Sequence, residues 1–294
     1  MLEEFLALLS SATWFYLLVL GTLGLTVGSF LNVVIFRVPV MLENYWQQQA
    51  REYLSIEPAH SSEDKPPRKF NLATPRSTCP CCETPIKARH NIPLLSYLLL
   101  QGRCAYCSAP ITIRYPLIEL LCAVVTTIVG YELGVTPYVL AALCLSWYLI
   151  ALTFIDLDHM LLPDNMTLPL MWGGIALALT GLGPISLVDS VAGAMVGYLI
   201  LWSVFWAFKL LTGKDGMGYG DFKLLAALGA WLGWQQLPLI ILLSSVIGAI
   251  VGIAMISMAR SRRGKPIPFG PYLAGAGWIS LLWGEQLTRI YLSV

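Results

Sequence analysis

Two aspartates at the ends of apolar segments are the first residues whose chemistry stands out. Asp156 follows the uncharged segment 137–155, and Asp221 precedes the apolar segment 222–234. An ionised aspartate within the hydrocarbon of a membrane costs at least about 2.5–3.5 kcal/mol, so such groups are kept with partners. If the two carboxyl groups meet, they share one proton, because both cannot ionise at that distance. One can then take a proton from water while the other donates to a peptide carbonyl, as in an aspartic protease.

Glycines crowd the chain just before Asp221, in the stretch Gly-Met-Gly-Tyr-Gly-Asp at 216–221. Gly218 and Gly220 allow positive φ and close approach of another chain, so a substrate strand could lie along this loop. A turn between two helices would account for the same glycines. A lone aspartate at a helix start is also often an N-cap or a partner of the helix dipole. The residues alone leave both interpretations open.

Two further acidic residues, Asp158 and Asp164, follow Asp156 closely in the chain. They could support the chemistry of the aspartate pair. Solvation of the surface by Asp158 and capping of the next helix by Asp164 account for them more simply. We therefore expect them to be supporting residues rather than catalysts.

Four cysteines form two pairs with the same spacing, Cys79 with Cys82 and Cys104 with Cys107. Four thiolates on two tight turns suit tetrahedral Zn²⁺, and such a site leaves no open position, so we expect the zinc to be structural. Disulfides are the alternative, but a cytoplasmic location argues against them. Cys81 could replace Cys82 in a C-x-C pairing, although a two-residue spacer suits one metal better.

The composition places these residues in a membrane protein. Of the 294 residues, 57% are apolar and 12% are charged, about half the charged fraction of a soluble domain. The mean hydropathy is +0.70. Such a chain has too few polar side chains to cover a water-soluble particle, which excludes a disordered protein, a collagen-like protein and an ordinary cytosolic enzyme. We expect an all-α polytopic membrane protein in contact with lipid, without a nucleic-acid partner.

Apolar segments of about membrane-spanning length recur along the chain. We expect about eight transmembrane helices, at residues 12–35, 116–131, 137–155, 166–182, 187–211, 222–234, 238–258 and 269–291. The sixth of these segments is short and lies directly against the seventh. Within the fifth, Gly193 and Gly197 are four residues apart and could form a contact between helices.

The one long polar stretch lies between the first two segments. It carries ten of the 18 Lys and Arg residues: Arg37, Arg51, Lys65, Arg68, Lys69, Arg76, Lys87, Arg89, Arg103 and Arg114. A stretch of this size cannot bury a large core, so a metal would help it fold. We expect a first transmembrane helix in 1–36, a Cys-rich zinc-binding insert in 37–115 and a seven-helix membrane domain with the aspartates in 116–294.

Basic residues sort to one side of the membrane in this arrangement. If the insert is cytoplasmic, the other basic residues on that side are Lys209, Lys214, Lys223, Arg260, Arg262, Arg263 and Lys265. Only Arg289 then falls outside the group, as the positive-inside rule favours. The same arrangement places Asp156 and Asp221 at the cytoplasmic face. We expect the basic run 260–265 to lie at anionic lipid headgroups.

Several separated motifs resemble those of the bacterial type IV prepilin peptidases, a family of G-x-G-D intramembrane aspartyl proteases. The motifs are Gly-Ser-Phe-Leu-Asn-Val at 28–33, Asp-Leu-Asp-His at 156–159, Leu-Pro-Asp at 162–164, Gly-Tyr-Gly-Asp at 218–221 and Pro-Ile-Pro-Phe-Gly-Pro-Tyr at 266–272. The Cys-rich insert is also similar to that family. The resemblance covers nearly the whole chain.

The resemblance implies a bifunctional enzyme of the bacterial inner membrane. Members of the family remove the short basic leader from type IV prepilins and from pseudopilins of type II secretion, on the cytoplasmic side. Many then methylate the new N-terminal amine with S-adenosylmethionine. The family's catalytic aspartates match Asp156 and Asp221, while Asp158 and Asp164 match acidic positions of the same motif.

Two other classes of protein compete with this interpretation. A membrane transporter or an assembly scaffold with a zinc knuckle could also hold aspartates within the membrane. Transport, however, predicts acidic residues deep within several spans, whereas both key aspartates lie at segment ends. A presenilin-like protease that cuts within helices is the enzymatic alternative, and the motif at 156–164 and the cysteine insert argue against it.

Overall fold

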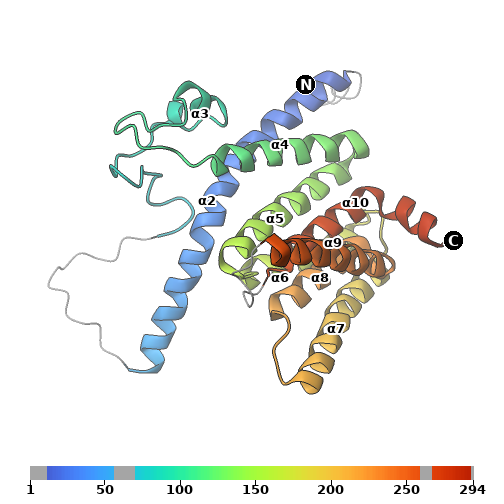
Figure 1. Ribbon diagram of the computed structural model, residues 1–294. Coiled ribbons are helices and arrows are strands. Elements are labelled where there is room, and N and C mark those ends of the chain that lie inside the picture. The colour runs from blue at the N-terminus through green and yellow to red at the C-terminus, as the bar shows by residue number, and fades with distance from the viewer. Residues whose placement is uncertain (1–11, 56–69, 259–266, 293–294) are drawn as a thin grey trace. The chain divides into compact units, whose positions relative to one another are not determined.

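The computed structural model describes residues 12–55, 70–258 and 267–292, and Figure 1 shows them as helices joined by loops. Within those ranges there is no β-strand, only two isolated bridges, Thr78 with Pro85 and Arg103 with Pro110. The described residues fall into two compact units, one of 18–125 and one of 12–17 with 126–292. The expectation of an all-α protein is confirmed.

Each of the eight expected apolar segments overlaps a helix of the structure. These helices are α2 (Thr13–Tyr53), α4 (Arg114–Leu133), α5 (Pro137–His159), α6 (Asp164–Thr180), α7 (Leu187–Thr212), α8 (Tyr219–Leu232), α9 (Leu237–Met258) and α10 (Gly270–Leu292). Among the described residues, five are long and apolar enough to cross a membrane: α2, α4, α5, α7, and α9 with the turn before it. With 17 and 14 residues, α6 and α8 fall short of the roughly 20 that a span needs. A multi-pass protein is thus supported, but a count of eight spans is not confirmed.

Helix α2 runs well past residue 35, where we expected the first span to end. Its 41 residues correspond to about 60 Å at 1.5 Å per residue, roughly twice the thickness of a bilayer's hydrocarbon core. Hydropathy marks where the apolar surface stops, but residues 41–53 include several good helix formers and the helix continues through them. The division at 37 and 116 stays a prediction.

Arg37, which we assigned to the insert, lies within α2 and is only 7% exposed. Its guanidinium donates to the carbonyl oxygens of Asn71 at 2.7 Å and Pro75 at 2.6 Å. It also lies over the ring of Phe70. This arginine therefore attaches the segment 70–75, where the described part of the chain resumes, to α2.

In the unit of 18–125, α2 packs closely on α4. A Cβ added at Gly28 would lie 2.7 Å from the Cα of Glu119. One turn further on, the Asn32 side chain donates to the carbonyl oxygen of Tyr115 at 3.2 Å. The short helices η1 (Ala88–His90) and α3 (Leu95–Leu99) belong to the same unit, and the Leu94 N–H donates to the buried Glu119 carboxylate at 2.9 Å.

In the second unit, α8 is the most buried helix and packs chiefly against α7 and α6, then α10. Gly193 of α7 and Gly229 of α8 face each other with their backbones in contact. A Cβ added at Gly197 would lie 2.7 Å from the carbonyl oxygen of Leu225. The helix contact expected at Gly193 and Gly197 is confirmed, and it brings the short helix α8 into the middle of the unit.

We expect Gly229→Ala to destabilise the protein, because the new methyl group would collide with the backbone of Gly193. Overpacking of this kind typically costs about 1–3 kcal/mol. The control is Gly275→Ala in α10, where a Cβ would have no neighbour within 4 Å. Thermal unfolding in detergent measures both variants. Equal melting temperatures for the two would contradict the close packing of α7 on α8.

Some expectations concern residues outside the described ranges. These are the basic run at 260–265, Pro266 at the start of its motif, and Lys65, Arg68 and Lys69 of the insert. The cytoplasmic orientation derived partly from them stays a prediction.

Candidate active site and metal centre

The two aspartates singled out from the sequence lie together in the second unit. Asp156 is in the last turn of α5 and Asp221 in the first turn of α8. Their exposed fractions are 5% and 6%, and they are close enough for their charges to interact. The fold thus brings two buried carboxyl groups that are 65 positions apart in the chain into one region of the unit, where their charges interact.

A third residue contacts this pair through its main chain. The N–H of Gly270, the first residue of α10, donates to Oδ2 of Asp156 at 3.0 Å. A Cβ at this position would lie 2.6 Å from the same oxygen, so no larger side chain fits there without movement. The motif at 266–272 was apparent in the sequence, but no role for Gly270 followed from the residues alone. A glycine at the start of an apolar helix was its only signal.

Leu162 packs between the two glycines that adjoin the aspartates. A Cβ added at Gly220 would lie 2.7 Å from the Cβ of Leu162, and one added at Gly270 would lie 3.2 Å from its Cδ1. The leucine itself is buried. Close packing therefore accounts for the glycine at 220 better than a flexible turn does.

Gly218, unlike Gly220, is not closely packed against another residue. It is the N-cap of α8 with an extended backbone, and a Cβ added there would lie 3.7 Å from Oδ2 of Asp221, an ordinary contact. The Asp221 N–H donates to the carbonyl oxygen of Gly218 at 3.3 Å. Gly218 thus begins the helix that carries Asp221, and no crowding excludes a small side chain.

The two supporting acidic residues are exposed, unlike the pair. Asp158 is two positions beyond Asp156 on α5, which turns it to a different side of the helix. Asp164 is the first residue of α6. Lys223 Nζ donates to its Oδ1 at 2.6 Å and to its Oδ2 at 2.7 Å. Lys223 is on α8, so this ion pair joins the start of α6 to the start of α8.

We expect either Asp164→Lys or Lys223→Asp alone to lower the stability of the protein, and the double charge reversal to restore part of it. Ion pairs this exposed contribute no more than about 1 kcal/mol. Thermal unfolding at low and high salt measures the effect, since salt screens such pairs. Glu285→Lys, at the exposed pair with Arg289 on α10, is the control. A double variant no better than the singles would contradict the pairing.

The four predicted metal ligands come together in the first unit. The sulfur atoms of Cys79, Cys82, Cys104 and Cys107 all lie within 4.8 Å of one another. The 3.8 Å between the Cys79 and Cys107 sulfurs equals the spacing of about 3.8 Å expected for tetrahedral zinc with Zn–S bonds of about 2.3 Å. Cys81 is exposed and outside the cluster. The pairing expected from the spacing is confirmed, and the cluster could bind a metal.

The two halves of this centre have the same local structure. The Cys79 N–H donates to the carbonyl oxygen of Thr84 at 3.0 Å, and the Cys104 N–H donates to that of Ala109 at 2.8 Å. One residue in each turn has positive φ, Glu83 at 54° and Ser108 at 58°. The sequence carries a signal for this likeness beyond the cysteine spacing, since C-x-x-C-x-x-P-I occurs at both 79–86 and 104–111.

At two of the four cysteines, Cys82 and Cys104, hydrogen bonds within the turns favour the thiolate, the form that binds metals. Side-chain and main-chain hydrogen bonds from Thr84 lower the pKa of the Cys82 thiol to about 6. Main-chain hydrogen bonds from Cys107 and Tyr106 lower the pKa of the Cys104 thiol. The donor set thus suits a divalent cation that prefers sulfur, such as zinc.

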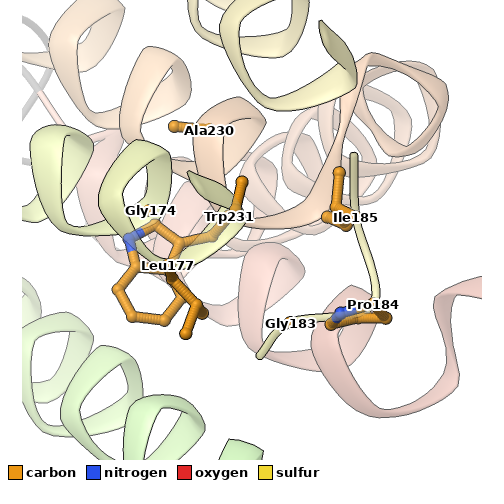
Figure 2. Close-up of a pocket in the computed structure, with 8 residues that line it drawn as sticks. Gly174, Leu177, Gly183, Pro184, Ile185, Ala230 and Trp231 are labelled. Carbon is orange, nitrogen blue, oxygen red and sulfur yellow. The ribbon is translucent and has the colours of Figure 1, made fainter. Parts of the chain in front are cut away.

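A small pocket lies at the other end of α8 from Asp221 (Figure 2). Gly174, Leu177, Pro184, Ile185 and Trp231 are among its lining residues. Its cavity volume of about 10 Å³ has room for one water molecule. It is therefore too small to hold a peptide or a cofactor.

Comparisons with known proteins agree along almost the whole chain. A model described as the Bacterial Peptidase A24 N-terminal domain matches residues 22–133, and one described as the Type IV leader peptidase family matches residues 143–253. The chain is 59% identical over 280 residues to a prepilin leader peptidase/N-methyltransferase of Aeromonas hydrophila, covering 95% of each chain. Proteins of the same name match from Pseudomonas aeruginosa at 55% and Neisseria gonorrhoeae at 50%, each covering 92% of this chain and 91% of the relative. No solved structure matches significantly.

Proposed function

Because this chain belongs to the type IV leader peptidase family, we propose that Asp156 and Asp221 are its catalytic pair. The chain is a multi-pass membrane enzyme that processes type IV prepilins and N-methylates the product. The observation that carries the catalytic assignment is the burial of these two carboxyl groups within electrostatic reach of each other.

The proposed reaction needs one water and one shared proton. One carboxylate takes a proton from the water while the water oxygen bonds to the scissile carbonyl carbon. The other carboxyl group gives its proton to the carbonyl oxygen. The carbon–nitrogen bond then breaks as the amine takes the proton held by the first carboxyl group, while one hydroxyl of the tetrahedral intermediate returns its proton to the second carboxylate, which leaves a carboxylic acid, an amine and the pair again sharing one proton. Gly218 and Gly220 directly precede Asp221 in the chain, and Leu162 packs on Gly220 and on Gly270, the residue that hydrogen-bonds to Asp156.

We further propose that cleavage removes a basic leader on the cytoplasmic side of the inner membrane. The support is the distribution of Lys and Arg, of which all but Arg289 would fall on the side of the insert with all eight expected segments crossing the membrane. The exposed apolar side chains of α7 and α9 would contact lipid. Pseudopilins of type II secretion are proposed as additional substrates, in line with the motifs at 156–164 and 218–221.

Two cofactors belong to this proposal. Zinc, held by Cys79, Cys82, Cys104 and Cys107, would be structural, because four thiolates fill its coordination sphere. S-adenosylmethionine would supply the methyl group, in line with the N-methyltransferase names of the relatives.

The test is to incubate the detergent-solubilised full chain with a purified type IV prepilin and follow the substrate by mass spectrometry. We expect loss of the leader and then, when S-adenosylmethionine is added, a gain of one methyl group on the new N terminus. If the Asp156→Asn variant removed the leader at the same rate as the wild-type chain, the catalytic assignment would be contradicted.

A further inference from the structure

We propose that Gly270 is a positioning residue of the peptidase site, whose main-chain N–H makes Asp156 the member of the pair that carries the negative charge. This inference rests on the proposed catalytic pair and adds an assignment of roles. Asp156 would take the proton from water, and Asp221 would enter the reaction protonated and give its proton to the carbonyl oxygen. The contact that carries the inference is the 3.0 Å hydrogen bond from Gly270 to Oδ2 of Asp156.

Three features of its position work against a charge on Asp156. It is buried, it lies near a second carboxyl group, and it is in the last turn of α5, where the partial negative end of the helix disfavours an anion. The hydrogen bond from Gly270 offsets them, because a hydrogen bond donated to a carboxylate favours its charged form. Gly270 also begins a helix of 23 residues. The partial positive charge at the N-terminal end of this helix also favours the charged form of Asp156.

Asp221 has a weaker arrangement of the same kind. It lies in the first turn of α8, and the Gly218 main chain hydrogen-bonds to its carboxylate. Within the described residues, however, the main-chain N–H that donates a well-formed hydrogen bond to the pair reaches Asp156, not Asp221. A direct hydrogen bond to a charged group is stronger than the dipole effect of a helix turn, so the charge should settle on Asp156.

Other titratable groups on the helices around the pair point elsewhere. On α5, Asp158 and His159 are exposed. Asp164 of α6 and Lys223 of α8 bind each other. Besides Lys223, the titratable groups nearest to the pair along α8 and α10 are Tyr219, which packs on Phe205, and Tyr272, whose ring lies near Gly248. The titration of Asp156 should therefore depend mainly on Asp221 and Gly270.

The first test observes the Gly270 amide in the intact protein. Phe269-Gly270 is the only Phe-Gly pair in the sequence, so carbonyl-¹³C phenylalanine with ¹⁵N glycine selects this one amide by NMR in detergent. We expect its proton shift to follow a titration with pH in the wild type and in Asp221→Asn, but not in Asp156→Asn. The proposal would be overturned if the Gly270 amide proton shift did not change with pH in the wild type. It would also be overturned if the shift changed with pH in Asp156→Asn as it does in the wild type.

The second test compares pH–rate profiles of prepilin cleavage. In Gly270→Ala the new methyl group displaces the Asp156 oxygen from the N–H. Asp156 then holds its proton more tightly, and we expect the acidic limb of kcat/KM to move up by about one pH unit. Leu162→Ala leaves the N–H in place, so the rate should fall without a shift of the limb. Gly275→Ala, an open site on the same helix, should leave both unchanged.

The outcomes separate this inference from the catalytic assignment. If Gly270→Ala and Leu162→Ala lower the rate with the same pH profile as the wild type, Gly270 is only structural and the inference fails. If Asp156→Asn still cleaves prepilin normally, the catalytic assignment itself fails. If Gly270→Ala does not fold, the NMR titration of the wild type and of the two aspartate variants still tests the inference.

Discussion

Asparagine at position 156 or 221 should stop prepilin cleavage while leaving the protein folded in the membrane. General acid–base groups contribute about 10²–10⁴-fold to a rate, and the two act as a unit, so each single variant should lose nearly the whole effect. Asparagine has the shape of aspartate but cannot take a proton from water. Cleavage rates with purified prepilin, measured with matched amounts of folded enzyme, provide the test.

Asp158→Asn is the matched control, because it makes the same change two residues further along α5 on an exposed side chain. It should retain close to the wild-type rate. Methylation of a synthetic peptide that already has the mature N terminus should persist in both pair variants, since the aspartates act on the peptide bond. If Asp158→Asn loses as much cleavage as Asp156→Asn, the buried pair is not the catalytic unit.

Replacing Cys82 by serine should abolish the proposed zinc binding and unfold the cysteine-rich segment. Zinc binding to small cysteine sites is worth about 10–16 kcal/mol in apparent free energy at neutral pH, so losing one of four ligands removes much of the free energy that keeps such a segment folded. Zinc content per chain and protection of the segment from limited proteolysis are the measurements. A strong chelator acting on the wild type should reproduce the change.

The neighbouring residue provides a control for the cysteine. Cys81 is exposed and outside the cluster, so Cys81→Ser should keep both the metal and the protection. Retention of zinc by Cys82→Ser together with its loss from Cys81→Ser would show that the pairing is C-x-C at this turn. Loss of prepilin cleavage in Cys82→Ser would not separate folding from catalysis, so the metal content decides.

The metal centre was predictable because its geometry is local. Each turn is fixed by neighbours in the chain, so the spacing of Cys79 to Cys82 and of Cys104 to Cys107 already determined which thiols meet. The excess of apolar residues likewise determined the helices, since a backbone within lipid must satisfy its own hydrogen bonds. The two aspartates could be singled out because a carboxyl group at the end of an apolar segment is costly without a function.

Other features depend on contacts that no short stretch of sequence contains. Hydropathy could not show that α2 continues to Tyr53, because a helix can leave lipid without ending. Hydropathy also could not show that α8, which is 14 residues long, is buried against α7 through Gly193 and Gly229. Leu162 acquires its place only when the loop before α6 packs on Gly220 and Gly270.

The sequence by itself determined the kind of protein and its reactive groups: an apolar helical chain, four thiols for a metal and two candidate acids. Only the tertiary structure decided that α5 and α8 place those acids within reach of each other and that the first amide of α10 binds one of them. The physical reason is range. Helix hydrogen bonds and turn geometry act between neighbours in the chain, whereas the environment of a buried carboxyl group is set by helices that are distant in sequence.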